Sequence, residues 1–317
     1  MTRSPDISVV INNYNYGQFV GQAIESALDQ KDVKAEVIVV DDGSTDDSGD
    51  VIRGFGSAVR AQFQPNGGQA RAINSGVAMA EAPILAFLDA DDWFLPGKLL
   101  SVLDAFDSSP KAGIVYHRLQ PVYSDGSPAF SAIPRSLCQG DLGPRLQRSG
   151  GRWPFPMTSS LAVRQSLWRN AGNIPGDFSI SADAWITGIL PMISPVVALP
   201  RPLACYRIHN NAWFRAQDDA GMLARRMAHW EHTVRITNTF LSSRQMRGRV
   251  MLRDHFDYQV AAARLGRPGA LRPLELARLG LLDAGEPNVL RRLRAILGAM
   301  TALRQDRTET AGQVDTS

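Results

Sequence analysis

The sequence predicts an α/β fold in which helices flank a mostly parallel, Rossmann-like sheet, followed by a C-terminal helical extension. Short apolar runs alternate with helical patterns between residues 7 and 88, which is typical of right-handed βαβ units. Several of these runs end in polar or acidic residues, where ligands collect in open α/β sheets. From about residue 216 onward the apolar spacing is helical.

Four strands are expected in the first 90 residues. They lie at residues 7–11, 36–40, 58–63 and 84–88. The first is a β-branched run, and the last consists of five apolar residues, so both are predicted to be buried on both faces. Helices are expected between the strands: one after Gly17, one starting at Ser44, whose spacing to Asp47 is typical of an N-cap, and one over residues 69–80.

The pattern is less regular beyond residue 110. Strands are expected at 113–116 and 196–199, and residues 157–168 are expected to run from a strand or turn into a helix. Four C-terminal helices are expected at 222–240, 245–265, 274–282 and 288–304. We therefore divide the chain into a catalytic region (1–214), a basic helical extension (215–305) and a disordered tail (306–317).

The composition is that of a soluble globular protein, with 44% apolar and 21% charged residues among 317. The net charge of +3 conceals an acidic N-terminal part and a basic, Arg-rich C-terminal part of the sequence. The two cysteines, Cys138 and Cys205, lack metal-ligand spacing, which argues against a zinc site or a disulfide framework. We find no signal-peptide pattern and no run near the roughly 18 apolar residues of a membrane span, so we expect a cytoplasmic protein.

Acidic and polar residues follow three of the expected strands. Tyr14 follows the first, Asp41 and Asp42 the second, and Asp89, Asp91 and Asp92 the fourth. The carboxyl ends of parallel strands share one edge of a sheet, so these groups should converge. Clustered carboxylates repel one another unless a cation joins them, and a hard divalent ion suits oxygen ligands. The alternative for a lone Asp-x-Asp is a solvated acidic turn.

The two glycine-rich ways of cradling phosphates are missing from the sequence. Neither Gly-x-Gly-x-x-Gly after the first strand nor Gly-x-x-x-x-Gly-Lys-Ser/Thr occurs. A nucleotide bound at this edge would therefore need a metal on Asp91 to neutralise its phosphates.

Two later polar residues have two readings each. Asp183 lies beside Trp185 and Ile186, where it is either a base with a raised pKa or a helix cap. His209 is either a metal ligand or an ordinary hydrogen-bonded histidine.

The last helix, 288–304, is amphipathic and basic. It either lies on an anionic membrane surface or packs its apolar side on the catalytic region, and we favour packing.

Four motifs in order and at family spacing resemble the family 2 glycosyltransferases, which have a GT-A fold and transfer a sugar from a nucleotide-sugar to an acceptor. The resemblance covers roughly residues 7 to 211. The motifs are residues 9–15 with Ser26 and Gln30, residues 37–44 (Val-Ile-Val-Val-Asp-Asp-Gly-Ser), residues 68–76, and residues 87–92 (Phe-Leu-Asp-Ala-Asp-Asp).

The resemblance implies roles for individual residues. Tyr14 would lie near the base, Asp41 would hydrogen-bond the base, Asp89 would contact the ribose, and Asp91 would hold Mg²⁺ or Mn²⁺ on the diphosphate. The implied donor-binding residues also include Asn13, Gly68, Arg71, Asn74 and Ala90. Of these, Arg71 either touches phosphate or sits on a helix face.

Residues 180–185 resemble the family's late acidic motif, which makes Asp183 the catalytic base, and His209 is similar to a position that contributes a further metal or phosphate contact. Two departures are Asn13, where the family often has proline, and Ala182, where it commonly has glutamate. The implied reaction is an inverting single displacement onto a glycan or lipid-linked glycan in polysaccharide biosynthesis. The base is uracil, guanine or thymine.

Other functions remain open or are disfavoured. A nucleotidyltransferase would usually carry a basic, glycine-rich loop after the first strand, but residues 12–17 contain no Lys or Arg. A phosphotransfer receiver would place its acidic pair after the first strand, not the second. A non-catalytic sugar-nucleotide binder stays possible because of Ala182. We expect no nucleic-acid partner, and peripheral membrane contact only through the basic C-terminal helices.

Overall fold

The computed structural model describes residues 4–176, 178, 182–209 and 219–314. It divides into two compact units. The sheet unit comprises Met1–Leu142 and Phe155–Ala212, and the helical unit comprises Gly143–Pro154 and Trp213–Ser317. The segment Gly143–Pro154 thus belongs with the C-terminal helices, an association that the sequence pattern does not indicate.

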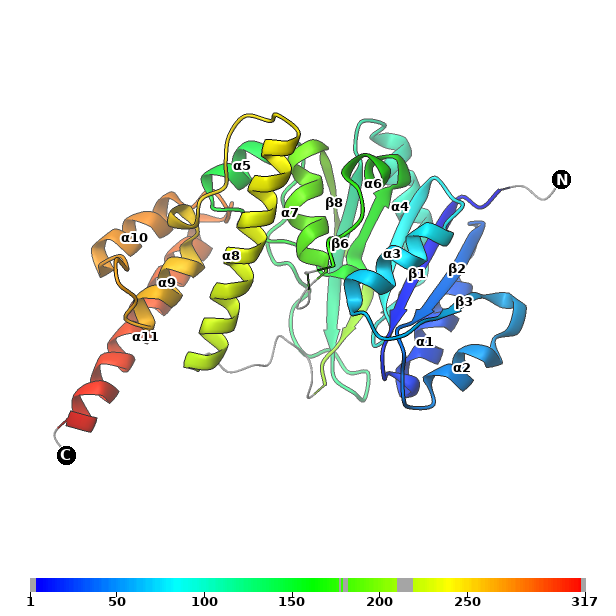
Figure 1. Ribbon diagram of the computed structural model, residues 1–317, viewed down its shortest axis with the longest axis horizontal. Helices are drawn as coiled ribbons and strands as arrows, with labels where there is room; N and C mark the ends of the chain where they lie inside the picture. The colour runs from blue at the N-terminus through cyan, green and yellow to red at the C-terminus, as the bar shows by residue number, and fades with distance from the viewer. Residues whose placement is uncertain (1–3, 177, 179–181, 210–218, 315–317) are drawn as a thin grey trace. The chain divides into compact units, whose positions relative to one another are not determined.

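The sheet unit is built on one eight-stranded sheet with the order β3-β2-β1-β4-β7-β6-β8-β5 (Figure 1). The strands are β1 (Ile7–Asn13), β2 (Ala35–Asp41), β3 (Arg60–Phe63), β4 (Ile84–Asp89), β5 (Trp93–Phe94), β6 (Ile114–Val122), β7 (Leu161–Arg164) and β8 (Val196–Arg207).

The sheet is mixed, but four of its seven strand pairings are parallel, including β6 with β8, which confirms the predicted mostly parallel sheet. Strands β3, β2, β1 and β4 are mutually parallel, as the alternation of strands and helices predicts. Strand β7 is antiparallel to both β4 and β6, and β5 is antiparallel to β8.

Helices cover both faces of this sheet. They are α1 (Gly17–Leu28), α2 (Ser48–Gly54), α3 (Gln69–Met79), α4 (Lys98–Ser108), α6 (Gln165–Ala171) and α7 (Asp183–Ile193). The buried sides of α1, α2 and α4 share one core with Val9 and Ile11 of β1. Helix α3 lies on the opposite face, where a Cβ on Gly76 would come within 2.4 Å of Val10 Cγ1. Only glycine permits this close approach of α3 to β1.

The helix expected to start at Ser44 starts four residues later, at Ser48. Ser44 does not cap it, because the Ser44 hydroxyl accepts hydrogen bonds from the Asn15 backbone N–H (2.8 Å) and Asn13 Nδ2 (3.2 Å). The Asp46 carboxylate bonds the start of the helix instead. It accepts hydrogen bonds from the backbone N–H groups of Ser48 (3.0 Å) and Gly17 (2.9 Å). Side chains such as Ser44 often bond loop backbone instead of a helix terminus.

The helical unit contains α5 (Gly143–Arg148), α8 (Ala220–Ser243), α9 (Phe256–Arg264), α10 (Pro273–Leu282) and α11 (Val289–Val314). The helix expected over 245–265 is shorter, because Gln245 and Gly248 adopt positive φ angles of 55° and 90° that a right-handed helix excludes. It begins at Phe256, where His255 Nδ1 accepts the Tyr258 backbone N–H.

The tail predicted to be disordered is helical through Val314, the last residue that the structure describes. Extending an existing helix costs far less than starting one. The helical unit also contains a partly buried ion triad, in which Arg152 Nε donates to Asp257 Oδ2 at 2.5 Å and Arg152 Nη1 donates to Asp283. Among the residues described, no helix combines the length and the apolarity needed to span a bilayer.

Candidate functional site

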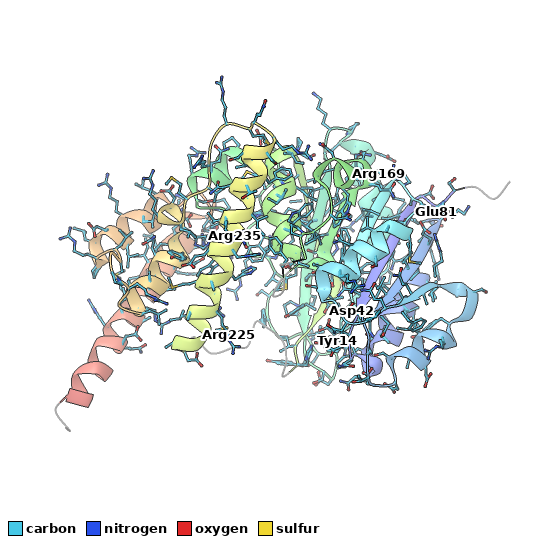
Figure 2. The ribbon with its side chains drawn as sticks, viewed as in Figure 1. Tyr14, Asp42, Glu81, Arg169, Arg225 and Arg235 are labelled. Carbon is cyan, nitrogen blue, oxygen red and sulfur yellow. The ribbon has the colours of Figure 1, made fainter. Side chains whose placement is uncertain are left out.

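The ends of β2, β1 and β4 meet at one edge of the sheet. Asn13 is paired with Asp41 in the β1–β2 register, and Asn12 is paired with Asp89 in the β1–β4 register. Neighbouring strands are about 4.8 Å apart, which separates Asp41 from Asp89 by about 10 Å. Figure 2 labels Tyr14 and Asp42 at this edge, and Glu81, which precedes β4, at the opposite edge.

Asp41 lies in the wall of an open pocket. Its Oδ2 accepts from Asn13 Nδ2 (2.8 Å), and its Oδ1 accepts from the Ser44 backbone N–H (2.9 Å). These contacts fix the carboxylate while leaving lone pairs unused. The pocket has a volume of about 380 Å³ and is lined by Asp41, Gly43, Ser44, Arg53, Phe63 and Gln64, among others. A pocket of this size suits a small organic group.

The turn before α3 is organised by Asp42, which is 2% exposed. Its carboxylate accepts from Gln64 Nε2 (2.6 Å) and from the backbone N–H groups of Gly67 (3.0 Å) and Gly68 (2.6 Å). The Gly68 N–H is therefore bonded within the protein. Gly68, whose φ is 84°, directly precedes α3.

Three other residues of the implied donor-binding set have defined surroundings. Asn74 bonds the Ile174 backbone in both directions, donating from Nδ2 (2.8 Å) and accepting at Oδ1 (3.0 Å). Its amide thus anchors the chain that leads to α7. Arg71 is exposed and extends over Gly67, with no ion pair among the described residues. Ala90 is buried and donates its N–H to the Asn12 carbonyl (3.2 Å).

Gln69 connects Asp89 to the start of α7. Gln69 Nε2 donates to Asp89 Oδ1 at 3.0 Å, and Gln69 Oε1 accepts the Ala182 backbone N–H at 3.2 Å. Asp183, the first residue of α7, directly follows Ala182. Its carboxylate is close enough to Asp89 for their repulsion to contribute to the Asp89 pKa. Two residues that are 94 positions apart in the sequence therefore face the same site.

The acidic cluster carries more negative charge than the chain compensates. Burial, followed by repulsion from Asp91 and Asp183, raises the pKa of Asp89 to about 7. Burial and repulsion from Asp91 and Asp89 also raise the pKa of Asp92 well above its usual value. The same carboxylates, after burial, raise the pKa of the Tyr16 hydroxyl to about 12. A bound cation would relieve all three.

Asp91 and His209 form a pair that fits a divalent metal ion. His209 Nε2 lies 2.8 Å from Asp91 Oδ2, and the two side chains are 14% and 16% exposed. Within the part of the chain that the structure describes, no group of three His, Cys, Asp or Glu side chains forms a complete metal site. One carboxylate and one imidazole suit Mn²⁺, or Mg²⁺ less closely, when water and phosphate oxygens supply the remaining ligands.

Asp92 points away from this pair and supports the turn of residues 89–92, which we call the acidic turn. It accepts from Ser159 Oγ (2.6 Å) and from the Arg207 backbone N–H (3.0 Å), while Ser159 Oγ itself accepts the Asp89 N–H (3.1 Å). Lys98, which is fully buried, donates from Nζ to the Ser159 carbonyl at 2.7 Å and lies 3.3 Å from the centre of the Phe94 ring.

Sequence reasoning missed these supporting residues. Gln69 lies within the quoted motif of residues 68–76 and Arg207 lies two residues before His209, so these positions could have suggested them. Ser159 and Lys98 carry no such signal, because their partners lie more than 60 residues away and a lysine after Pro-Gly is usually solvated. Residues 180 and 181 of the late acidic motif lie outside the described residues, as does the segment that follows His209.

Comparison with protein families and curated proteins gives matches to known glycosyltransferases. Residues 8–149 match the model of glycosyl transferase family 2. An uncharacterized glycosyltransferase of Nostoc sp. is 35% identical over 265 residues, which are 80% of this chain and 81% of the relative.

Two solved structures have the same fold. Residues 1–349 of TarS from S. aureus, in complex with UDP-GlcNAc, give a TM-score of 0.55 at 16% identity, covering 96% of this chain and 92% of that one. A mannosyltransferase from Pyrobaculum calidifontis, in complex with GDP-Man and Mn²⁺, gives 0.53 at 18% identity, covering 99% and 85%. The mixed sheet with its flanking helices is thus the GT-A arrangement.

Proposed function

This chain belongs to glycosyltransferase family 2, and from that premise we propose that it transfers a sugar from a nucleoside-diphosphate sugar to an acceptor hydroxyl with inversion. The observation that carries the proposal is the Gln69 bridge. It holds Asp89 next to the first turn of α7, where Asp183 lies.

The donor's nucleoside would occupy the β2–β1 side of the edge. Asp41, fixed by Asn13 and Ser44, offers a carboxylate to the N–H groups of a base, and Tyr14, which is 46% exposed, is available to stack on it. Asp89 would accept a hydrogen bond from the ribose. The bases in the two similar structures are uracil and guanine, and both remain candidates for this chain, as does thymine.

Asp91 and His209 would hold Mg²⁺ or Mn²⁺ against the donor's diphosphate. An ion bound there would supply the positive charge that stabilises the diphosphate as a leaving group. A cation bound there would also lower the pKa values of Asp89 and Asp92, which burial and then repulsion between the neighbouring carboxylates raise.

Asp183 would take the proton from the acceptor hydroxyl as that oxygen attacks the anomeric carbon. Its position at the first residue of α7 supports this role, because the positive end of a helix keeps a carboxylate ionised and therefore able to accept a proton. The C–O bond to the acceptor forms while the bond to the diphosphate breaks, so a single displacement inverts the anomeric centre. General base catalysis of this kind contributes about 10²–10⁴-fold.

We place the catalytic function in residues 1–214 and propose a glycan or lipid-linked glycan as acceptor, in polysaccharide assembly at the cytoplasmic face of a membrane. The family and the basic C-terminal helices support this assignment. A non-catalytic sugar-nucleotide binder is the second candidate, because Ala182 occupies the position where the family commonly has glutamate.

Thermal unfolding of the purified chain with a panel of nucleotide sugars, with and without Mn²⁺, tests the donor site. A ligand that binds only the folded state raises the unfolding temperature, and we expect this for one donor and only with the metal. Product formation from that donor with membrane-extracted acceptors then separates the enzyme from the binder. If the donor binds tightly and no acceptor is ever glycosylated, the second candidate holds.

A further inference from the structure

Helices α10 and α11 of the helical unit expose an unusual number of large apolar side chains. Leu290 and Leu297 of α11 are 66% and 67% exposed, and Leu282 of α10 is 68% exposed. Others that are exposed on the two helices are Leu274, Leu281, Val289 and Leu293. Single exposed leucines are normal, but a contiguous group marks an interaction surface.

The exposed leucines of α11 form a stripe beside its packed side. Leu290, Leu293 and Leu297 follow the i, i+3, i+7 spacing of one helix face. Ile296 and Ala299 are buried on an adjoining side, in a cluster with Phe256 of α9. The buried stripe of α11 thus packs within the helical unit, the expected packing of α11 on the catalytic region stays a prediction, and a second apolar stripe is exposed.

The end of α10 packs on the buried side of α11. Arg292 Nη1 donates to the Leu281 carbonyl at 3.0 Å, and a Cβ on Gly280 would come within 2.5 Å of Ile296 Cγ1. Leu281 and Leu282, at this end of α10, are themselves exposed. We call the exposed stripe of α11 formed by Leu290, Leu293 and Leu297 the leucine face.

The charge around the leucine face is positive. Arg291 and Arg294 flank it on α11, and Arg278 is exposed on α10. Of the nearby acidic side chains, Glu275 is paired with Arg272, Asp283 with Arg152 and Asp306 with Arg264, while the Glu286 carboxylate accepts the Asn288 backbone N–H. A leucine stripe flanked by free arginines on one helix is the pattern of an interfacial helix.

We propose that the leucine face binds a bilayer that carries anionic lipids. The leucines would enter the boundary between headgroups and acyl chains, and the arginines would reach the lipid phosphates along their aliphatic stems. A protein partner would need acidic groups around an apolar groove, whereas an anionic membrane offers both features over any area. The proposal stands independently of the donor site, and it would keep the chain where lipid-linked acceptors reside.

Flotation of the full-length chain with phosphatidylcholine vesicles, with and without phosphatidylglycerol, tests the proposal. We expect binding only to the anionic vesicles, and weakening at high salt because exposed charges are screened. The double variant Leu290→Gln/Leu297→Gln and the double variant Arg291→Gln/Arg294→Gln should each weaken binding about tenfold or more.

Matched controls come from the sheet unit. Leu28→Gln replaces a leucine of α1 that is 41% exposed, and Arg169→Gln replaces an exposed arginine of α6, labelled in Figure 2. Neither should change vesicle binding. The proposal is overturned if the wild-type chain ignores anionic vesicles, or if the leucine-face variants bind them as well as the wild type. A dimer in light scattering that Leu290→Gln/Leu297→Gln dissociates, without vesicle binding, would overturn it in favour of a protein interface.

Discussion

His209 Nε2 lies 2.8 Å from Asp91 Oδ2, although the two residues are 118 positions apart. The antiparallel pairing of β5 with β8, which sets Trp93 opposite Cys205, brings the acidic turn next to the end of β8. The rings of Tyr16 and Phe19 pack on the imidazole, with centroids 5.6 and 5.8 Å away. The first loop, the acidic turn and the last strand therefore meet at His209.

This contact leads to a prediction about the metal. His209→Gln should raise the Mn²⁺ concentration needed for half-maximal activity about tenfold or more, because it removes one of two protein ligands. Saturating Mn²⁺ should restore most of the turnover. The control is His229→Gln on α8 in the helical unit, which should leave the Mn²⁺ requirement unchanged. An unchanged requirement in His209→Gln would remove His209 from the metal site.

If Asp183 is the catalytic base, its substitution should lower turnover without weakening donor binding. Asp183→Asn should lower kcat by about 10²–10⁴-fold, because the amide cannot accept the proton. The donor's Kd should stay within about twofold, since the shape of the side chain is kept. Isothermal titration and product formation measure the two effects. Wild-type turnover in this variant would exclude Asp183 as the base.

The Gln69 bridge predicts a positioning effect. Gln69→Leu removes the hydrogen bonds to Asp89 and Ala182, so the start of α7 loses its link to the acidic turn. We expect kcat to fall by about tenfold or more and KM to change less, because a small misplacement of a catalytic group is costly. Gln62→Leu on β3 is the matched control, because the Gln62 amide donates to Gln64 and to no other side chain among the described residues. Equal decreases in kcat from the two variants would argue against a catalytic role of the Gln69 bridge.

The buried imidazole of His255 predicts acid sensitivity of the helical unit. Burial lowers the pKa of His255 from its usual 6.5 to about 4. Between these values the unfolded chain binds a proton that the folded chain does not, so stability falls as the pH falls. At pH 5 this loss is about 2 kcal/mol relative to pH 7.

Urea unfolding of the wild type and of His255→Asn at pH 5 and pH 7 measures this contribution. The asparagine keeps a side-chain acceptor for the N-terminus of α9, and it does not titrate. The variant should therefore lose about 2 kcal/mol less than the wild type between the two pH values. Equal losses in the two proteins would mean that other groups cause the acid sensitivity.

The parts of the fold that the sequence predicts are those encoded by local patterns. The β-branched run of β1 and the apolar run of β4 are buried on both faces, and the turns that follow them carry Tyr14 and Asp91. Parallel pairing then brings the strand ends to one edge, because βαβ units leave little choice of topology. The GT-A fold and the approximate position of the site follow from this.

Other parts depend on contacts that no local pattern encodes. The antiparallel β7 and the buried pair of Lys98 with the Ser159 carbonyl join segments about 60 or more residues apart. Ser44 has the spacing of an N-cap, but its hydroxyl is taken by Asn13 and Asn15. In each case tertiary partners, rather than neighbouring residues, decide what the side chain does.

The release of nucleoside diphosphate from nucleotide sugars, measured with Mn²⁺ and membrane-extracted acceptors for the wild type and for Asp91→Asn, tests the central claim most directly. We predict that the wild type turns over one donor of the panel with formation of a glycosylated product, and that Asp91→Asn, which loses the metal-binding carboxylate, does not. Turnover by Asp91→Asn at the wild-type rate, or no turnover of any nucleotide sugar by the wild type, would contradict the account.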